Sequence, residues 1–417
     1  MSPAASPSRG PVRPGFYEFI ALIASLMALT ALTIDAMIPA LPPIGEALSV
    51  SDDNDRQLVI GVMLVGFGFA QLIHGPLSDR FGRRPLLVGG LLIYVTGSIL
   101  AALAPSFELL LAGRFLQGVA VAATRVLAVS IVRDLYVGRR MAQIMSMAMM
   151  VFMVVPVMAP LIGQIILSVA DWRWIFWMFA ATGLALGTWA RLRLPETLAP
   201  ENRRPLTFAR IGGGWRRTLT ERKSLGYTLA GGMLSGALFG FINSIQQIVY
   251  DTFERPNMLV ATFAVIAGTM SLAALINSRI VLRLGTRKVS HSALFVFIGF
   301  AAAASLVAYG GNSSLWLFIA LLTGSMGAFG LCGANFSAMA MEDMGAIAGT
   351  ASSVQGAITV VMGAVIGGTI GQFYDGTTVP ISLGFLVCGL VSLGIVLLTE
   401  RGRLFHEEEL EQEQVAA

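Results

Sequence analysis

Charged residues are scarce in this chain. Aspartate, glutamate, lysine and arginine make up 12% of the 417 residues, whereas hydrophobic residues make up 55% and the mean hydropathy is +0.75. These values fall far outside the range of soluble globular domains. They predict a protein that crosses a membrane several times, with the lipid bilayer as its main solvent. The net charge of +4 resides mainly in loops, so we expect no nucleic-acid partner.

Cysteine and histidine are also rare. The two cysteines, Cys332 and Cys388, both fall in apolar stretches, and the chain has three histidines. This leaves neither a disulfide framework nor metal-ligand spacing. The chain also lacks a Gly-x-x-x-x-Gly-Lys-Ser/Thr loop for nucleotide phosphates. We therefore expect no metal, no cofactor and no enzymatic activity, so energy must come from an ion gradient.

Long apolar runs dominate what is present. A membrane-spanning helix needs about 20 mainly apolar residues, and runs of that length recur along nearly the whole chain. They lack the short alternation of a transmembrane barrel, and unpaired backbone groups are not tolerated in hydrocarbon. The sequence thus predicts an all-α membrane protein with twelve helices, at about 19–42, 56–77, 86–104, 108–132, 142–168, 172–194, 225–250, 257–279, 288–309, 313–341, 346–371 and 379–399.

Basic residues predict the orientation of these helices. If odd-numbered helices run outward, about 23 of the 28 lysines and arginines lie on one side, and only Arg56, Arg173 and Arg255 lie on the other. The positive-inside rule then places both termini in the cytoplasm. No short apolar region with a small-residue cleavage site is apparent, so we expect no signal peptide.

Six predicted helices precede the longest polar stretch and six follow it. The predicted units are a cytoplasmic tail at 1–18, a six-helix bundle at 19–194, a cytoplasmic linker at 195–224, a second bundle at 225–399 and an acidic tail at 400–417. A 6+6 layout is common in secondary transporters, which bind substrate between the halves near mid-membrane. Such a bundle needs no second copy to form its pathway, so we expect a monomer.

The loop between the second and third predicted helices reads GPLSDRFGRRP, at 75–85. It resembles a signature of the major facilitator superfamily, Gly-x-x-x-Asp-Arg-x-Gly-Arg-Arg, through Gly75, Asp79, Arg80, Gly82, Arg83 and Arg84. The glycines would permit a tight reversal, Asp79 can lie against a helix N-terminus of the other half, and Arg83 can pair with Asp134. The resemblance implies a charge cluster that latches the halves in an outward-facing state, although these arginines also fix topology. INSRIVLRLGTRKV, at 276–289, occupies the corresponding place in the second half but lacks the acidic residue.

The fourth predicted helix carries LLAGRFLQGVAVAATRV at 110–126. It resembles the Arg-x-x-Gln-Gly signature of the same superfamily through Arg114, Gln117 and Gly118. VVPVMAPLIGQ, at 154–164, resembles the Gly-Pro-x-x-Gly signature of its antiporter branch.

In that fifth helix Pro160 and Gly163 match, but Ala159 replaces the first glycine. Pro156 and Pro160 lie one turn apart and should kink or loosen the helix.

The first helix, LTALTIDAMIPALPPIG at 29–45, is similar to that of bacterial drug:proton antiporters of the bicyclomycin and chloramphenicol resistance type. DWRWIFWM at 171–178, RLPETL at 193–198 and MEDMGAIAGTASSVQGA at 341–357 look like other segments of that subgroup. The resemblance covers most of the chain and implies a major facilitator fold in a bacterial inner membrane.

Three ionisable residues are expected inside the membrane, namely Asp35, Arg114 and Arg125. Such a group costs about 2.5 to 3.5 kcal/mol at a helix centre and is a functional candidate by default. A rise of 1.5 Å per residue places Asp35 and Arg114 at a similar depth, so we expect them to face each other across a cavity. Arg125, eleven residues from Arg114, falls on the same helix face. Asp35 is then either a static partner of Arg114 or a carboxylate that exchanges a proton between the two sides.

Further polar residues are candidates for the cavity wall. They are Gln117 in the first half and Asn243, Gln246, Gln247 and Asn335 in the second, for which hydrogen bonding between packed helices is the alternative. The run MSMAMMVFM, at 145–153, offers a soft surface for varied apolar ligands. Filler that faces lipid is the alternative for that run.

Together these features predict a proton-coupled exporter of small amphipathic compounds or drugs that works by alternating access. Its partners would be protons, a small-molecule substrate and the lipid bilayer. One rival is a proton-coupled importer or exporter of a specific metabolite or siderophore, which the direction of transport would distinguish. The other rival is a non-transporting membrane receptor, which an absence of substrate-driven proton movement would support.

Overall fold

The protein is described from a computed structural model. The structure describes residues 14–136, 138–199, 201, 203, 208–311 and 314–406. The predicted tails fall at the two ends of the chain, and their residues 1–13 and 407–417 lie outside this part.

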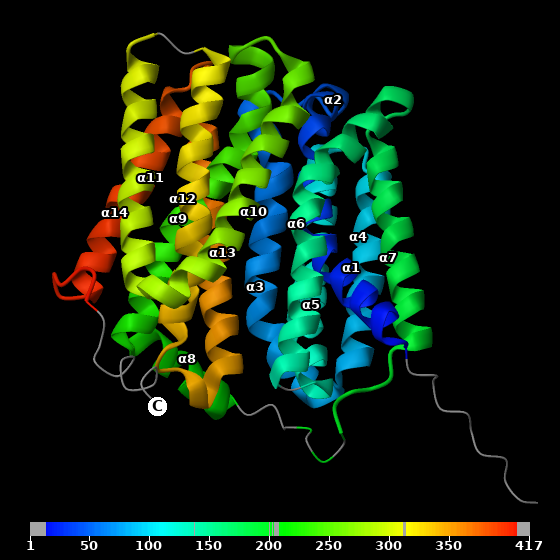
Figure 1. The fold of residues 1–417 in the computed structure, drawn as a ribbon. Helices are drawn as coiled ribbons and strands as arrows, with labels where there is room; N and C mark the ends of the chain where they lie inside the picture. Colours follow the sequence, from blue (N-terminus) through cyan, green and yellow to red (C-terminus); the bar gives the residue numbers. More distant parts are fainter. Residues whose placement is uncertain are drawn as a thin grey trace, which may run out of the picture.

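All regular elements of the described residues are helices (Figure 1). Twelve helical segments among them are long and apolar enough to cross a membrane, which confirms the all-α prediction and the twelve predicted runs. The long helices are α1 (Phe16–Asp35), α3 (Leu58–Phe81), α4 (Arg83–Ala102), α5 (Phe107–Leu135), α6 (Gly138–Val169), α7 (Arg173–Arg193), α9 (Arg222–Gln247), α10 (Leu259–Leu284), α11 (Thr286–Tyr309), α12 (Leu315–Met341), α13 (Ala348–Gln372) and α14 (Val379–Thr399). Short helices are α2 (Leu41–Ala47), α8 (Phe208–Thr220), η1 (Ile38–Ala40), η2 (Asp53–Gln57), η4 (Ile248–Thr252), η5 (Pro256–Met258) and η6 (Gly345–Ile347).

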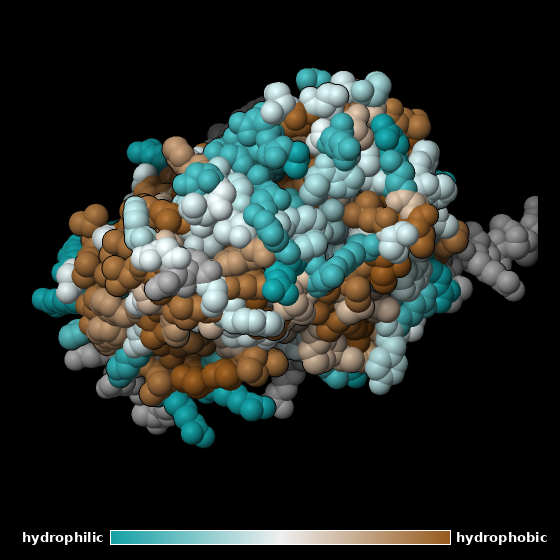
Figure 2. Space-filling view, turned by 90° about the horizontal axis from the view of Figure 1, so that it is seen from above, coloured by the Kyte–Doolittle hydropathy of each residue, from teal (hydrophilic) through white to brown (hydrophobic). Residues whose placement is uncertain are grey.

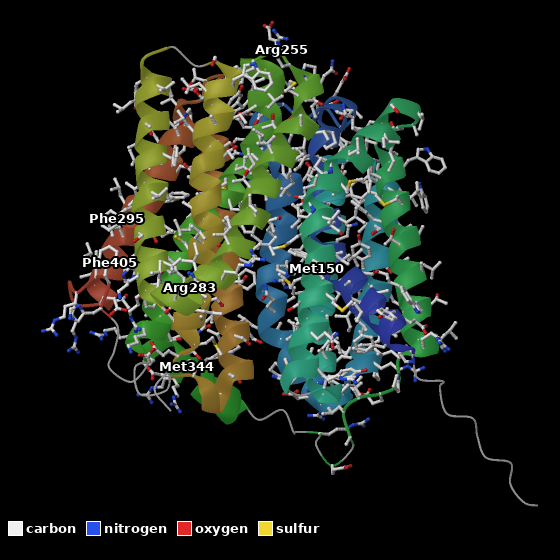
Figure 3. All side chains as sticks on the ribbon, in the orientation of Figure 1. Met150, Arg255, Arg283, Phe295, Met344 and Phe405 are labelled. Carbon is white, nitrogen blue, oxygen red and sulfur yellow. The ribbon has the colours of Figure 1, made fainter. Side chains whose placement is uncertain are left out.

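The long helices form two sets that stand side by side (Figure 1). The first set contains α1 to α7 and the second contains α9 to α14, and they meet where α3 packs on α13 and α6 packs on α10. We call the side where α1 begins and α14 ends the terminal side, and the other, where α2 lies, the opposite side. Arg255 marks the opposite side in Figure 3, and Arg283 lies toward the terminal side.

The first predicted helix, 19–42, is broken in its outer part. Helix α1 ends at Asp35, and the chain continues through η1 into α2. The physical reason is Pro39, which has no N–H to donate to the carbonyl of Asp35 four residues earlier. At the break the Ala36 N–H donates to the Leu32 carbonyl at 3.1 Å and the Met37 N–H to the Ile34 carbonyl at 3.4 Å. Asp35 therefore lies at a helix end and not in a helix middle.

Helix α8 lies in the predicted linker, where the sequence analysis expected no element. It lies at the terminal side (Figure 1), and its Gly214 lies against Thr350 of α13. With 13 residues it is too short to span a membrane. Its three consecutive glycines are also poor helix formers, so no local signal marked it.

Candidate functional site

A cavity of about 620 Å³ lies between the two sets of helices. Its walls come from α1, α3, α5 and α6 of the first set and from α9, α10, α12 and α13 of the second. The wall extends to Met341, the last residue of α12, and to Ser352 in the first turns of α13, so the cavity reaches the terminal side. This volume is in the range that holds a drug-sized molecule.

The cavity wall is mainly apolar. Its aromatic and methionine side chains are Phe67, Met149, Phe152, Met153, Tyr227, Phe239, Phe241, Phe263, Met270, Phe329, Phe336 and Met341. The predicted methionine run is thus divided, because Met149 and Met153 line the cavity while Met150 (labelled in Figure 3) does not and is 57% exposed. Of the charged residues that the structure describes, only Asp35 and Arg125 lie on the wall.

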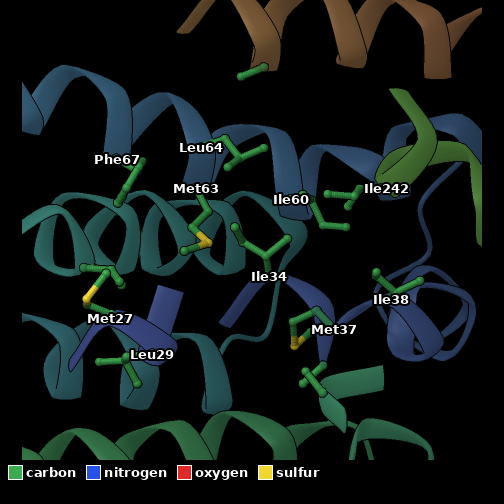
Figure 4. Close-up of a cluster of buried hydrophobic side chains, with 14 of the residues drawn as sticks. Met27, Leu29, Ile34, Met37, Ile38, Ile60, Met63, Leu64, Phe67 and Ile242 are labelled. Carbon is green, nitrogen blue, oxygen red and sulfur yellow. The ribbon is translucent and has the colours of Figure 1, made fainter. Parts of the chain in front are cut away.

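Asp35 lies on this wall at the C-terminal end of α1. The residue is 4% exposed, and no described residue forms a hydrogen bond or ion pair with its carboxylate. The neighbouring Ile34 packs among apolar side chains that include Ile60 and Met63 of α3 (Figure 4). The carboxyl group is therefore held in apolar surroundings beside a cavity.

Helix α6 touches the chain immediately after Asp35. A Cβ atom on Gly163 would lie 2.2 Å from the Ala36 carbonyl oxygen and 3.0 Å from Cγ of Pro39. Only glycine allows this approach, so the predicted fifth-helix signature packs on the break in α1. Pro156 and Pro160 both lie inside α6, which continues through them, and Pro156 lines the cavity.

Arg114 does not face the cavity, so the predicted arrangement opposite Asp35 is wrong. It is fully buried, and its guanidinium donates to the carbonyl oxygens of Val59 at 2.7 Å and Thr33 at 3.2 Å. It also donates to Oε1 of Gln117 at 2.9 Å, and Gln117 donates to Oγ of Ser98 at 2.7 Å. The physical reason is the break in α1, which frees carbonyls in its last turn for a buried donor. Arg114 and Gln117 thus connect α1, α3, α4 and α5.

We expect Arg114→Met to destabilise the protein by about 3 kcal/mol, because it leaves buried carbonyl groups without a donor. The melting temperature of the purified protein in detergent would show the loss. Arg125→Met is the matched control, because Arg125 has no hydrogen-bond partner among the described residues. Equal melting temperatures for the two variants would contradict the structural role of Arg114.

Arg125 lies on the cavity wall, eleven residues beyond Arg114 on α5. Its guanidinium carbon lies 5.3 Å from the ring centroid of Phe152, and no carboxylate pairs with it in the described part of the chain. The two arginines were expected on one cavity face, but Arg114 is buried among four helices and only Arg125 meets the cavity.

The other polar residues that were expected on the wall lie elsewhere. Asn335 of α12 donates to Asn277 of α10 at 2.9 Å and accepts from it at 3.3 Å, which is the helix-packing alternative. Asn243 and Gln246 are buried in α9 and are not part of the wall.

A polar cluster that was not predicted from the sequence joins the two sets on the opposite side. We call it the closing cluster, and it consists of Asn54 and Gln57 of the first set with Gln247, Gly371, Gln372 and Tyr374 of the second. Figure 2 looks onto this side and shows polar side chains gathered across its middle. The cavity is therefore closed on the opposite side by hydrogen bonds between the sets.

Gln247 is central in the closing cluster. Its Oε1 accepts from Gln57 at 2.5 Å, and its Nε2 donates to Asn54 at 2.8 Å. Asn54 in turn donates to the carbonyls of Gln372 at 3.1 Å and Tyr374 at 3.0 Å. Burial raises the pKa of the Tyr374 hydroxyl, so this group stays protonated and donates to the Gln247 carbonyl at 3.3 Å.

The predicted pairing of Arg83 with Asp134 is confirmed at 2.9 Å. Arg83 also pairs with Asp79 at 2.6 Å, and its backbone N–H donates to Glu196 at 2.9 Å. Gly82 makes the reversal with a φ of +100°, which only glycine adopts readily.

Other members of the signature are placed differently from the expectation. Gly75 lies inside α3 and not in the reversal, and a Cβ there would lie 3.3 Å from Oγ of Ser353 on α13. Asp79 pairs within its own set, and no described residue of the second set bonds to it. Arg80 lies over the ring of Phe81, and Arg84 donates to the Arg191 carbonyl.

The second set has a charge cluster at the corresponding place. Gly285 makes the reversal with a φ of +78°, and Arg287 at the start of α11 pairs with Glu342 and Glu400, each at 3.0 Å. The loop sequence of this copy lacks the acidic residue of the first copy. The acidic partners come from the ends of α12 and α14 instead, so the cluster persists.

Two sets of helices around a central cavity, with an unpaired carboxyl group on its wall, define the class of membrane carriers. The chain belongs to the Major Facilitator Superfamily, which matches residues 23–368. It is a secondary transporter of small molecules and not an enzyme.

Similar proteins support this assignment. The chain is 30% identical over 390 residues to the uncharacterised MFS-type transporter YdgK of Bacillus subtilis, covering 91% of this chain and 94% of that one. It is 27% identical over 400 residues to the bicyclomycin resistance protein homolog of Haemophilus influenzae, covering 92% and 97%. The multidrug resistance protein MdtL of Escherichia coli O45:K1 is 33% identical over 180 residues, covering 43% and 46%. The expected resemblance to the bicyclomycin resistance type is thereby confirmed.

Solved structures show the same fold. A D-xylose-proton symporter matches with a TM-score of 0.69 at 15% identity, covering 91% of this chain and 97% of that one. The human organic anion transporter MFSD10 matches with a TM-score of 0.62 at 18% identity, covering 93% and 99%.

Proposed function

We propose that this protein exports small amphipathic compounds from a bacterial cell in exchange for protons, by alternating access in the inner membrane. Two of the relatives above carry drug resistance in their names, and the cavity has the size and the apolar wall that such compounds need. The excess of basic residues on the terminal side supports placing that side in the cytoplasm. The transport unit is one chain, with halves at 19–194 and 225–399 joined by the linker at 195–224.

Asp35 is the observation that carries the proposal. A buried carboxylate with no ion partner is costly when charged, and binding a proton removes this cost. Its place on the cavity wall lets substrate and proton compete for the same region, which couples their flows. One pH unit supplies about 1.4 kcal/mol, and 100 mV supplies about 2.3 kcal/mol per charge.

The geometry corresponds to an inward-facing state under this proposal. The cavity reaches the terminal side, and the closing cluster seals the opposite side. A latch that holds the outward-facing state should then be disengaged between the halves. In agreement with this, Asp79 pairs with Arg83 of its own set, and no residue of the second set that the structure describes bonds to it. The proposed switch consists of breaking the closing cluster while the Asp79 region docks on the second set.

Proton movement in inside-out membrane vesicles tests the proposed function. After respiration has acidified the lumen, a transported compound should drive protons out and make the lumen more alkaline. A panel of antibiotics and cationic dyes would be added to vesicles with and without the protein, with an uncoupler to give the full-scale signal. If no compound moves protons although the protein is inserted, proton antiport of this panel is wrong.

We expect Asp79→Asn to reduce transport about tenfold while membrane insertion stays intact, because the neutral side chain weakens docking in the outward-facing state. The vesicle assay measures the rate, and blotting of the membranes measures insertion. Asp343→Asn is the control, because its exposed side chain has no partner among the described residues. Equal rates for both variants and the wild type would refute the latch.

A further inference from the structure

Arg125 is a cation on the cavity wall without a counter-charge. Its guanidinium lies over the ring of Phe152 at 5.3 Å, and no acceptor oxygen in the described part of the chain bonds to it. An arginine side chain stays charged and presents five N–H donors in a planar fork. Because a charge at this depth is costly unless it is compensated, the unfilled donors point to something that enters the cavity.

Asp35 does not supply the missing negative charge. Arg114 reaches the carbonyl of Thr33, so its level on α5 is the level of Asp35 on α1. Arg125 lies eleven residues closer to the terminal side, which is about 16 Å along the helix. The two charged groups on the wall are therefore separate sites, one deep and one nearer the mouth.

Gln71 provides a second unpaired donor on the wall of the same cavity. It is 8% exposed, it lines the cavity, and its Nε2 atom has no acceptor. Helices α3 and α5 run in the same direction, and Gly118 packs against Met63 and Phe67. Gln71 lies four residues beyond Phe67 and Arg125 seven beyond Gly118, so they share a level to within about one helical turn.

From these donors we infer that Arg125 and Gln71 bind an anionic oxygen group of the substrate, and that the cavity takes amphipathic acids. The inference rests on the proposed transport function and names its substrate class. A carboxylate, sulfonate or phosphate group matches the guanidinium fork, and such charge-assisted hydrogen bonds are strong where water is excluded. The rings and thioethers beside them, Phe67, Met149 and Phe152 among them, hold the apolar body.

Binding of a matched acid and amide tests this inference. The probes are radiolabelled 1-naphthaleneacetate and 1-naphthaleneacetamide, which differ in charge but hardly in size, and tetraphenylphosphonium serves as a cationic probe. They are added to the full-length protein in lipid nanodiscs at pH 7. We expect the wild type to bind the acetate at least about tenfold more tightly than the amide, as a charge-assisted hydrogen bond predicts.

Substitutions at the two donors assign the preference. Arg125→Gln should abolish the preference for the acid over the amide, and Arg125→Lys should keep part of it. Gln71→Leu should reduce the preference, and it decides the question even if Arg125→Gln fails to fold. The inference is overturned if the wild type does not bind the acetate, binds the cation or the amide as tightly, or keeps its preference in a folded Arg125→Gln protein.

The binding assay separates this inference from the proposed function. It needs no proton gradient, so preferential acid binding without substrate-driven proton movement would refute export by proton antiport and leave the anion site standing. Proton-coupled export of neutral or cationic compounds with no acid preference would refute the anion site and leave antiport standing.

Discussion

Replacing Asp35 with asparagine is expected to abolish proton-driven export and to leave the protein folded. Asparagine has nearly the same shape as aspartate but cannot release or take up a proton. Because no described residue bonds to the carboxylate, the substitution breaks no interaction that holds the helices together. We expect uphill accumulation of substrate in energised inside-out vesicles to fall by at least about 100-fold, as for loss of an essential proton-transfer group.

Substrate exchange in the absence of a proton gradient distinguishes a loss of proton coupling from a loss of substrate access to the cavity. Vesicles preloaded with substrate should still exchange labelled for unlabelled compound in Asp35→Asn, since the cavity and its gates are unchanged. Asp35→Glu, which retains an ionisable group, should keep measurable uphill transport. Uphill accumulation by Asp35→Asn at the wild-type level would show that the coupling proton binds elsewhere.

The helix count was predictable because it depends on length and composition alone. Each apolar run had to be a helix in lipid, and all twelve are helical. The equal depth of Asp35 and Arg114 was also predictable, since Arg114 reaches the Thr33 carbonyl two residues before Asp35. Counting residues fixes height along a helix, whereas which neighbour a side chain meets depends on how the helices are rotated and packed. That is why Arg114 was expected in the cavity and is found in a helix junction.

The closing cluster could not be predicted by counting residues along single helices. Gln57 and Gln247 are 190 positions apart in the sequence, and Asn54 meets Gln372 across 318 positions. Neither the composition of a short helix nor that of a loop indicates which distant segment it will contact. The neighbouring glutamines Gln246 and Gln247 point about 100° apart around α9. Both glutamines were expected on the cavity wall, yet Gln247 instead joins the two sets on the opposite side.

The two charge clusters show why the repeat of the two halves can be recognised in the structure although the two loop sequences have diverged. Arg83 binds acidic side chains from the end of α5 and from the segment after α7, and Arg287 binds those at the ends of α12 and α14. A glycine with positive φ stands directly before Arg83 and two positions before Arg287. In the second set the loop supplies only the arginine and the turn. The loss of the acidic residue that pairs with Arg83 in the first set therefore does not remove the cluster.

Replacing Gln247 with leucine is expected to open the opposite side. The leucine side chain has a similar volume but removes the hydrogen bonds to Gln57 and Asn54. The loss of two hydrogen bonds costs about 2 kcal/mol, which shifts the equilibrium about thirtyfold toward the state in which the opposite side is open. Only the inward-facing state pays this cost, because the cluster joins the two sets only when the opposite side is closed.

Distance measurements between the sets would detect this shift. Spin labels at Ser51→Cys and Thr377→Cys report on the opposite side, and the native Cys332 and Cys388 are buried, so labelling is selective. We expect Gln247→Leu to transfer much of the distance distribution to longer values. Gln246→Leu is the matched control on the same helix, because it removes no hydrogen bond between the sets. If both variants give the wild-type distribution, the closing cluster does not hold the opposite side shut, and the packing of α3 on α13 must do so instead.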